Sequence, residues 1–159
     1  KAMLRRALPD ALRRVQQHRE AGHRTILVTG TIDLMVEPFL PYFDEVVAGR
    51  MHERDGVLTG FLADPPLVDE ARAAWLRHYA ATHDFDLTQS YGYGDSHADL
   101  VWLQMLGNPT AVKPDIHLYR HAQEKHWNVV DWTRRSTPTS IDDGSEQESQ
   151  TITEGAGTA

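Results

Sequence analysis

Cysteine is absent from this chain of 159 residues. Disulfide bonds, thiolate zinc sites and cysteine nucleophiles are therefore excluded, and the composition agrees with a reducing compartment. Long apolar runs are absent too, because no stretch approaches the roughly 18 residues that a membrane-spanning helix needs. The basic residues 1–6 are not followed by an apolar segment like that of a signal peptide. We therefore expect a cytoplasmic protein without a membrane span.

A basic surface is also lacking, because the formal net charge is −7 at pH 7. Residues 136–159 contain five Asp and Glu and no Lys or Arg, so they carry −5 and the rest of the chain −2. A nearly neutral body has no field that attracts nucleic acid. The last segment is rich in Ser, Thr and Gly and has almost nothing to bury. We expect one folded domain over residues 1–134, a disordered acidic tail over 135–159, and no nucleic-acid partner.

Apolar periodicity and turn residues divide the folded part into alternating helices and strands. The run Thr25–Val28 is typical of a buried parallel strand, and Asp55-Gly56 marks the turn of a small β-hairpin. The predicted helices are 9–21, 32–40, 65–82, 97–107 and 116–126, and the predicted strands are 25–28, 43–48, 49–54, 57–62, 90–93, 110–112 and 128–130. This alternation predicts an α/β fold with a parallel sheet.

Two loops are predicted at the carboxyl ends of strands, where α/β sheets bind ligands. Thr29-Gly30-Thr31 offers a hydroxyl and backbone N–H groups, which suit an anion. Asp95-Ser96-x-x-Asp99 places two carboxylates one helical turn apart, which suits Mg²⁺ with water and a substrate phosphate. Each loop also has a plain interpretation as the cap of the helix that follows it.

Other polar side chains fit a phosphate or metal site less specifically. Arg72 lies early in the helix before the Asp95 strand and can reach a phosphate as a forked donor, although a single arginine is more often a solvated surface residue. His117 and His121 have an i, i+4 spacing that can bind a metal. No further ligand is evident near them, so surface positions are favoured.

Taken together and in this order, these pieces resemble the haloacid dehalogenase (HAD) superfamily, and within it the phosphoserine-phosphatase-like subclass IB. The resemblance spans about residues 5–132 and includes "LPDALRRVQQHREAGHRTILVTGT", "FDEVVAGRMHERDGVLTG", "YGYGDSHADL" and "GNPTAVKPDIHL". It implies a three-layer, Rossmann-like parallel sheet with a small hairpin, and Mg²⁺-dependent hydrolysis of a small-molecule phosphate ester through an aspartyl-phosphate.

The resemblance also implies roles for individual residues. Thr29 and the Gly30 amide would bind the transferring phosphoryl group, and Arg72 stands where the family usually has a lysine. Asp95 and Asp99 would hold Mg²⁺. Lys113 stands where the family commonly has asparagine, so it is either an added phosphate contact or a surface residue.

The family's nucleophile motif, Asp-x-Asp-x-Thr at the end of an apolar strand, has one match by letter. Asp84-x-Asp86-x-Thr88 follows a helix end and not a strand. Only ten residues separate Asp84 from Asp95, whereas a parallel crossover needs about a dozen or more. We therefore interpret this segment as a helix-to-strand loop, and we expect the nucleophile strand upstream of residue 1.

By family topology, that strand lies between the Thr29 and Asp95 strands. Without it the sheet must close up, stay gapped or borrow a strand, and an unpaired buried edge is costly and prone to association. We therefore expect the chain alone to be poorly stable or self-associating.

Three functions stay open. The first is the C-terminal part of a HAD phosphatase, and the second is a non-catalytic HAD-like interaction or regulatory module, fused to or associated with other domains. The third is a Rossmann-like nucleotide binder, which is disfavoured because no Gly-x-Gly-x-x-Gly turn follows the first strand.

Overall fold

The computed structural model describes residues 9–132, so the acidic tail predicted for residues 135–159 lies outside the described residues. The α-helices are α1 (Pro9–Glu20), α2 (Asp33–Val36), α3 (Asp69–His83), α4 (Leu100–Leu103) and α5 (Ile116–Glu124), and the 3-10 helices are η2 (Glu37–Tyr42), η3 (Leu87–Gln89) and η4 (His97–Asp99). The strands are β1 (Ile26–Ile32), β2 (Glu45–Gly49), β3 (Met51–Arg54), β4 (Val57–Leu62), β5 (Tyr91–Gly94), β6 (Asn108–Val112) and β7 (Asn128–Val130).

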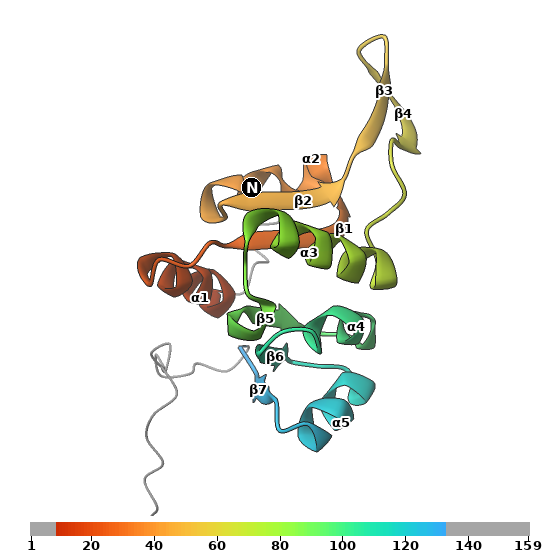
Figure 1. Cartoon of the computed structure of the whole chain (residues 1–159). Helices are drawn as coiled ribbons and strands as arrows, with labels where there is room; N and C mark the ends of the chain where they lie inside the picture. Colours follow the sequence, from red (N-terminus) through yellow and green to blue (C-terminus); the bar gives the residue numbers. More distant parts are fainter. Residues whose placement is uncertain (1–8, 133–159) are drawn as a thin grey trace, which may run out of the picture.

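The predicted α/β class with parallel strands and a small hairpin is confirmed. Strands β1 and β2 form one parallel sheet, and β5, β6 and β7 form a second parallel sheet in that order. Strands β3 and β4 form the antiparallel hairpin, which projects from the body (Figure 1). In the same view the parallel strands lie in the order β2-β1-β5-β6-β7.

The sheet is divided between β1 and β5. In the described part of the chain, no strand pairs with the edge of β1 opposite β2 or with the edge of β5 opposite β6. The described strands thus form two separate parallel sheets, and the absence of a middle strand stays a prediction. Two helices connect the halves. Helix α1 reaches β5 through a contact between His18 and Tyr93, and the start of α3 reaches Gly30 through Val68 and Asp99 through Arg72. The expected low stability or self-association stays a prediction.

The first candidate loop differs from its prediction. Strand β1 does not end at Thr29 but runs through Gly30 and Thr31 to Ile32, with an irregular register between Val28 and Ile32. The helix expected to follow is only the four residues of α2, and the 3-10 helix η2, with Pro41 inside it, replaces its second half. Proline lacks an N–H and blocks a regular α-helical turn, so the prolines in this segment explain the short helix.

Two further boundaries differ for local reasons. The helix predicted from Pro65 begins only at Asp69, after Val68, whose backbone is extended. The residue before a proline is disfavoured in helical backbone, which accounts for Asp64 and Pro65. The helix predicted over 97–107 is a 3-10 turn followed by one α-helical turn, α4. The predicted turn at Asp55-Gly56 is confirmed, since both residues have positive φ, 53° and 77°, as a type I′ hairpin requires.

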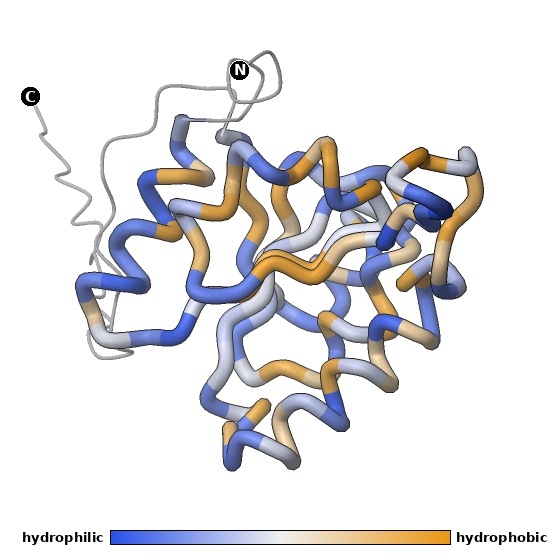
Figure 2. The backbone as a smooth tube through the Cα atoms, turned by 90° about the horizontal axis from the view of Figure 1, so that it is seen from above, coloured by the Kyte–Doolittle hydropathy of each residue, from blue (hydrophilic) through white to orange (hydrophobic). Residues whose placement is uncertain are grey.

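The buried core lies between the three-stranded sheet and the helices α4 and α5. Leu103, Ala111, Leu118 and Ala122 are fully buried there. Glycine permits this packing, because a Cβ on Gly92 would lie 2.2 Å from Leu106 Cδ1. Helix α1 covers the opposite face of β5 and is mostly hydrophilic, with apolar residues at intervals (Figure 2).

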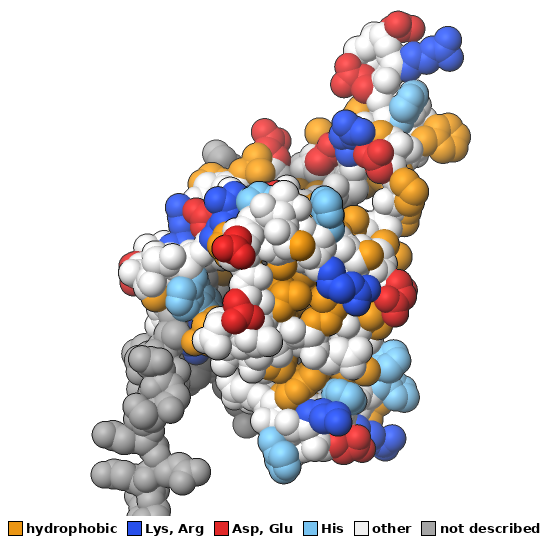
Figure 3. Space-filling view, in the orientation of Figure 1, with side chains coloured by type: hydrophobic (Ala, Val, Ile, Leu, Met, Phe, Trp, Pro, Cys, Tyr) orange, Lys and Arg blue, Asp and Glu red, His pale blue; other side chains and the backbone are white. Residues whose placement is uncertain are grey.

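Hydrophobic side chains are also exposed on the projecting hairpin (Figure 3). Val57 is 67% and Phe61 75% accessible, so the hairpin contributes little apolar burial to the fold. None of the helices between residues 9 and 132 is long and apolar enough to cross a membrane.

Candidate functional site

The Asp95–Asp99 loop follows β5 directly and is folded around the carboxylate of Asp99. Asp99 Oδ2 accepts hydrogen bonds from the Asp95 N–H at 3.0 Å, the Ser96 N–H at 3.2 Å and the Ser96 hydroxyl at 3.3 Å. The Ser96 carbonyl in turn accepts from the Asp99 N–H at 2.9 Å. The helix-cap interpretation of this motif therefore describes Asp99 well, and Gly94 permits it, because a Cβ there would lie 2.8 Å from Asp99 Cβ.

Arg72 reaches the same carboxylate from α3. Its Nη1 donates to Asp99 Oδ1 at 2.5 Å, and Trp102 Nε1 donates to the same oxygen at 3.1 Å. The side chains of Arg72 and Asp99 are only 16% and 9% accessible, so this ion pair is largely removed from water. Arg72 Nε is buried and has no hydrogen-bond partner among the described residues. One donor of the guanidinium is therefore left unpaired inside the protein.

Thr29 and Gly30 lie in the second half of β1, before its last residues Thr31 and Ile32. The Thr29 hydroxyl accepts from the Thr31 N–H at 3.1 Å, so part of its hydrogen-bonding capacity is used within the strand. A Cβ on Gly30 would lie 3.5 Å from Val68 Cγ1, and Val68 immediately precedes α3. The start of α3 thus lies beside Gly30, while Arg72 on its first turns reaches Asp99. The structure therefore joins Arg72, Asp95 and Asp99 through hydrogen bonds, whereas Gly30 is linked to them only through Val68 at the start of α3.

Asp95 is electrostatically different from Asp99. No cationic side chain within residues 9–132 forms an ion pair with it. Partial burial first, and then the nearby negative charges of Asp99 and Asp115, raise the pKa of its carboxyl group. A carboxylate whose negative charge is uncompensated attracts a cation.

The carboxylates of Asp95 and Asp99 meet the requirements of a divalent cation only in part. Asp95 supplies a carboxylate of the kind that Mg²⁺ prefers, whereas both oxygens of Asp99 already accept hydrogen bonds from Arg72 and the Asp95 N–H. In the described part of the chain, no group of three or more His, Cys, Asp or Glu side chains is arranged to hold a metal. A magnesium ion here would need ligands beyond these residues, such as water and the substrate phosphate.

The segment that matches the nucleophile motif by letter is a helix-to-strand connection, as predicted. Asp84 is the left-handed C-cap of α3, with φ 56°. Asp86 caps η3, where its Oδ1 accepts from the Thr88 N–H and hydroxyl at 2.8 and 2.7 Å. The connection packs against Gly107, where a Cβ would lie 1.7 Å from the Thr88 carbonyl oxygen. The connection precedes β5, whereas Asp95 follows β5, so the two lie at opposite ends of that strand.

The other candidate residues contribute less. Lys113 is exposed and has a positive φ of 44°. His117 and His121 belong to no group of three or more metal-ligating side chains among residues 9–132. The His117 ring lies 5.6 Å from that of His97, and His121 packs edge-on against Trp127 at 5.0 Å. The sequence interpretation missed Asp115, which caps α5 beside the Asp95 loop. Its signal was available as an Asp after proline at the start of a predicted helix.

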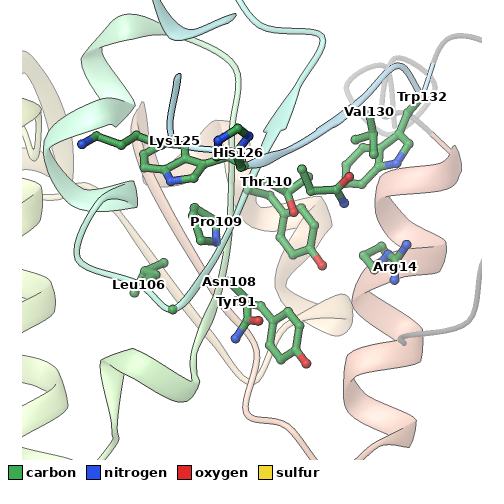
Figure 4. Close-up of a pocket in the computed structure, with 14 residues that line it drawn as sticks. Arg14, Tyr91, Leu106, Asn108, Pro109, Thr110, Lys125, His126, Val130 and Trp132 are labelled. Carbon is green, nitrogen blue, oxygen red and sulfur yellow. The ribbon is translucent and has the colours of Figure 1, made fainter. Parts of the chain in front are cut away.

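A cavity of about 510 Å³ lies elsewhere, along the face of β5, β6 and β7 that α1 borders (Figure 4). Its lining includes the first residue of each strand, Tyr91, Asn108 and Asn128, with Arg14 and Trp132 at one side. None of the five predicted site residues lines it, so it is separate from the carboxyl-end site.

A buried histidine near this cavity joins α1 to β5. His18 is 6% accessible; its Nδ1 lies 2.9 Å from His23 Nδ1, and its Nε2 lies 2.7 Å from the Tyr93 hydroxyl. The Tyr91 ring lies 4.8 Å from the His18 ring. Burial, and then the nearby His23 and Arg14, lower the pKa of His18 to about 4. Burial raises the pKa of Tyr93 to about 12.

The lowered pKa of His18 leads us to expect that the stability of the fold depends on pH. Its pKa in the folded chain, about 4, lies below the ordinary value of 6.5, so the unfolded chain binds the proton more tightly. Its stabilising effect is complete above pH 6.5 and declines as the pH falls towards 4. The free energy of unfolding is measured with denaturant from pH 7 to 4. Its pH dependence should show that the parent chain takes up about one proton more on unfolding than His18→Gln does. The exposed His78→Gln is the control, and an equal pH dependence for His18→Gln and the parent would contradict this assignment.

Comparison with known proteins gives a consistent picture. Residues 1–104 match the family model described as haloacid dehalogenase-like hydrolase. The "Inhibition of morphological differentiation protein" of Streptomyces azureus is 35% identical over 131 residues, which cover 79% of this chain and 46% of that protein. A histidinol-phosphatase of Neisseria meningitidis is 33% identical over 125 residues, which cover 74% of this chain and 56% of that protein.

Solved structures share the fold. A probable phosphoserine phosphatase from Vibrio cholerae superposes with a TM-score of 0.64 at 18% identity, covering 74% of this chain and 36% of that one. At this identity the likeness concerns the fold alone. The chain spans about half the length of the relatives that it matches.

Proposed function

We propose, on the premise that this chain belongs to the haloacid dehalogenase-like hydrolase family, that it forms the phosphate- and metal-binding part of a Mg²⁺-dependent phosphomonoesterase. Its fold is phosphoserine-phosphatase-like. The observation that carries the proposal is that Arg72, Asp95 and Asp99 meet in the loop after β5, while Gly30 of β1 lies beside Val68 at the start of the Arg72 helix. A cytoplasmic location is part of the proposal and rests on the absence of cysteine.

In this proposal each residue has a separate task. Asp95 is the carboxylate that contacts Mg²⁺. Asp99 is the second carboxylate of the metal site, and it also accepts the loop N–H groups of Asp95 and Ser96. The guanidinium of Arg72, whose Nε has no partner among the described residues, is proposed to contact a phosphoryl oxygen, together with the Thr29 hydroxyl and the Gly30 N–H. Bound Mg²⁺ would supply electrostatic stabilisation of charge on the phosphoryl oxygens. Positive charge and N–H donors aimed at that group are the main source of catalysis in phosphoryl transfer.

The nucleophile is proposed to come from a segment outside these 159 residues. Asp84 and Asp86 are the only Asp-x-Asp pair in the sequence, and both are capping residues between α3 and β5. The unpaired edges of β1 and β5 are the place for a further parallel strand, whose carboxyl end would point towards Asp95 and Arg72. An aspartate at that position would attack phosphorus and form an aspartyl-phosphate.

The substrate class in this proposal is a small-molecule phosphate ester. The name of the Neisseria relative, histidinol-phosphatase, agrees with that class and does not identify the ester for this chain.

The test compares the 159-residue chain with the product of the whole reading frame that encodes it. Hydrolysis of p-nitrophenyl phosphate is measured for both with Mg²⁺ and with chelator. We expect Mg²⁺-dependent hydrolysis from the whole product, lost on chelation, and background rates from the 159 residues alone. Chelator-resistant hydrolysis by the whole product would contradict the metal assignment. Mg²⁺-dependent hydrolysis by the 159 residues that is lost in Asp84→Asn would contradict the rejection of Asp84.

A second candidate function is a non-catalytic interaction or regulatory module. It is favoured by one observation: the charge of Arg72 is already paired with Asp99, whose two oxygens are fully engaged by donors of the chain itself. A whole product that folds but has no Mg²⁺-dependent hydrolysis would support the module.

A further inference from the structure

Two carboxylates accept hydrogen bonds from the loop that carries Asp95, one from within the loop and one from a neighbouring connection. Asp99 binds it from within, accepting the N–H groups of Asp95 and Ser96. Asp115 binds it from a neighbouring connection: its Oδ2 accepts the His97 N–H at 2.6 Å, and its own N–H donates to the Asp95 carbonyl at 2.9 Å. Three consecutive backbone N–H groups and one carbonyl of this loop are thus fixed by side-chain or main-chain partners.

Asp115 performs a second task with its other oxygen. It is the N-cap of α5, where Oδ1 accepts the N–H groups of His117 at 3.0 Å and Leu118 at 2.8 Å. The two tasks use different atoms, because Oδ1 caps the helix and Oδ2 reaches across to the loop after β5. Capping alone does not require the second contact. The tie to the Asp95 loop is therefore a separate feature of this side chain.

We propose that Asp115 is a positioning residue of the cation site, which ties the β6–α5 connection to the β5 loop and so fixes the backbone from which the Asp95 carboxylate projects. This inference rests on the proposed function, since it presupposes a cation at Asp95. Asp115 is given no direct contact with the cation in this proposal, and both of its oxygens accept backbone N–H groups. Its negative charge also adds to the potential at Asp95, which favours a divalent cation.

Asp115→Asn separates the two tasks. Asparagine retains an oxygen for the cap of α5 and is as good an N-cap as aspartate. Its amide NH₂ replaces Oδ2, so a donor faces the His97 N–H and the tie to the loop is lost. The matched control is Asp86→Asn, which makes the same chemical change at another capping aspartate, away from the Asp95 loop.

The measurement is Tb³⁺ luminescence sensitised by tryptophan in the 159-residue chain, with Mg²⁺ as competitor. Tb³⁺ is a hard cation that binds oxygen ligands, and the indole of Trp102 lies beside the site, with Nε1 3.1 Å from Asp99 Oδ1. We expect Asp115→Asn to raise the Kd for Tb³⁺ by about 10- to 100-fold, as removal of an outer hydrogen-bond partner usually does. Asp86→Asn should bind like the parent chain, and Trp102→Phe should lose the signal.

Amide hydrogen exchange of the metal-free chain provides the second readout. In Asp115→Asn the His97 amide should exchange faster, while the Leu118 amide keeps its protection because the cap is retained. Parent-like Tb³⁺ affinity in Asp115→Asn would overturn the inference even if exchange at His97 were faster, since the tie would then be structural only. Unchanged exchange at His97 would overturn it as well.

The failure of the proposed function has a different signature. If Asp95→Asn bound Tb³⁺ as tightly as the parent chain, the cation would not be at Asp95, and the metal assignment would fail together with this inference. If Asp95→Asn lost Tb³⁺ binding while Asp115→Asn bound Tb³⁺ like the parent chain, only the role given to Asp115 would be contradicted.

Discussion

Asp95→Asn is expected to reduce Mg²⁺-dependent hydrolysis by the whole product on the order of 10³-fold, which corresponds to about 4 kcal/mol of transition-state stabilisation. Asparagine keeps the size of the side chain and removes the charge that would hold the cation. The effect should appear in kcat/KM for p-nitrophenyl phosphate, measured at saturating Mg²⁺.

The fold should tolerate this change. No ion pair within the described residues depends on Asp95, and partial burial and the neighbouring carboxylates raise its pKa. A carboxyl group whose pKa is raised in the folded chain contributes less to stability once the pH rises above that pKa, because its ionised form is disfavoured there. At neutral pH, Asp95→Asn should therefore be at least as stable as the parent chain. Asp86→Asn is the activity control. Retained activity in Asp95→Asn would show that Asp95 does not bind the metal, and strong destabilisation would make it a structural residue instead.

Asp99→Ala is expected to lower the free energy of unfolding by about 3–5 kcal/mol, the usual cost of removing one partner of a buried ion pair. It leaves the guanidinium of Arg72 buried without a counter-charge, and it removes the acceptor of Trp102 Nε1 and of two loop N–H groups. Total stabilities of single domains are about 5–15 kcal/mol, so this one substitution threatens folding.

Urea unfolding monitored by tryptophan fluorescence measures the effect, and Asp64→Ala is the matched control. Asp64 pairs with Arg50 at 2.9 Å, but their side chains are 62% and 68% accessible, so its loss should cost no more than about 1 kcal/mol. The double variant Arg72→Met/Asp99→Leu should recover part of the loss, because it removes the orphaned charge. A cost for Asp99→Ala as small as that for Asp64→Ala would refute a structural role for the pair.

The sequence by itself determined the alternation of helices and strands, the hairpin and the position of the two acidic residues after β5. These features rest on local signals. Asp55-Gly56 accepts the positive φ values of a tight turn, and short β-favouring runs mark buried strands. The context of Asp84-x-Asp86-x-Thr88 also predicted a helix-to-strand connection, and in the structure both aspartates are capping residues of that connection.

Only the tertiary structure decided which partner each polar group finds. Arg72 and Asp99 are 27 residues apart, and nothing local to either predicts that their charges meet. The second contact of Asp115 likewise depends on the parallel pairing of β5 with β6, which brings their following connections together. The extension of β1 through Gly30 follows its pairing with β2 as far as Gly49. Local sequence sets the conformations a segment can adopt, but long-range hydrogen bonds and charge pairing select among them, and those depend on segments distant in the chain.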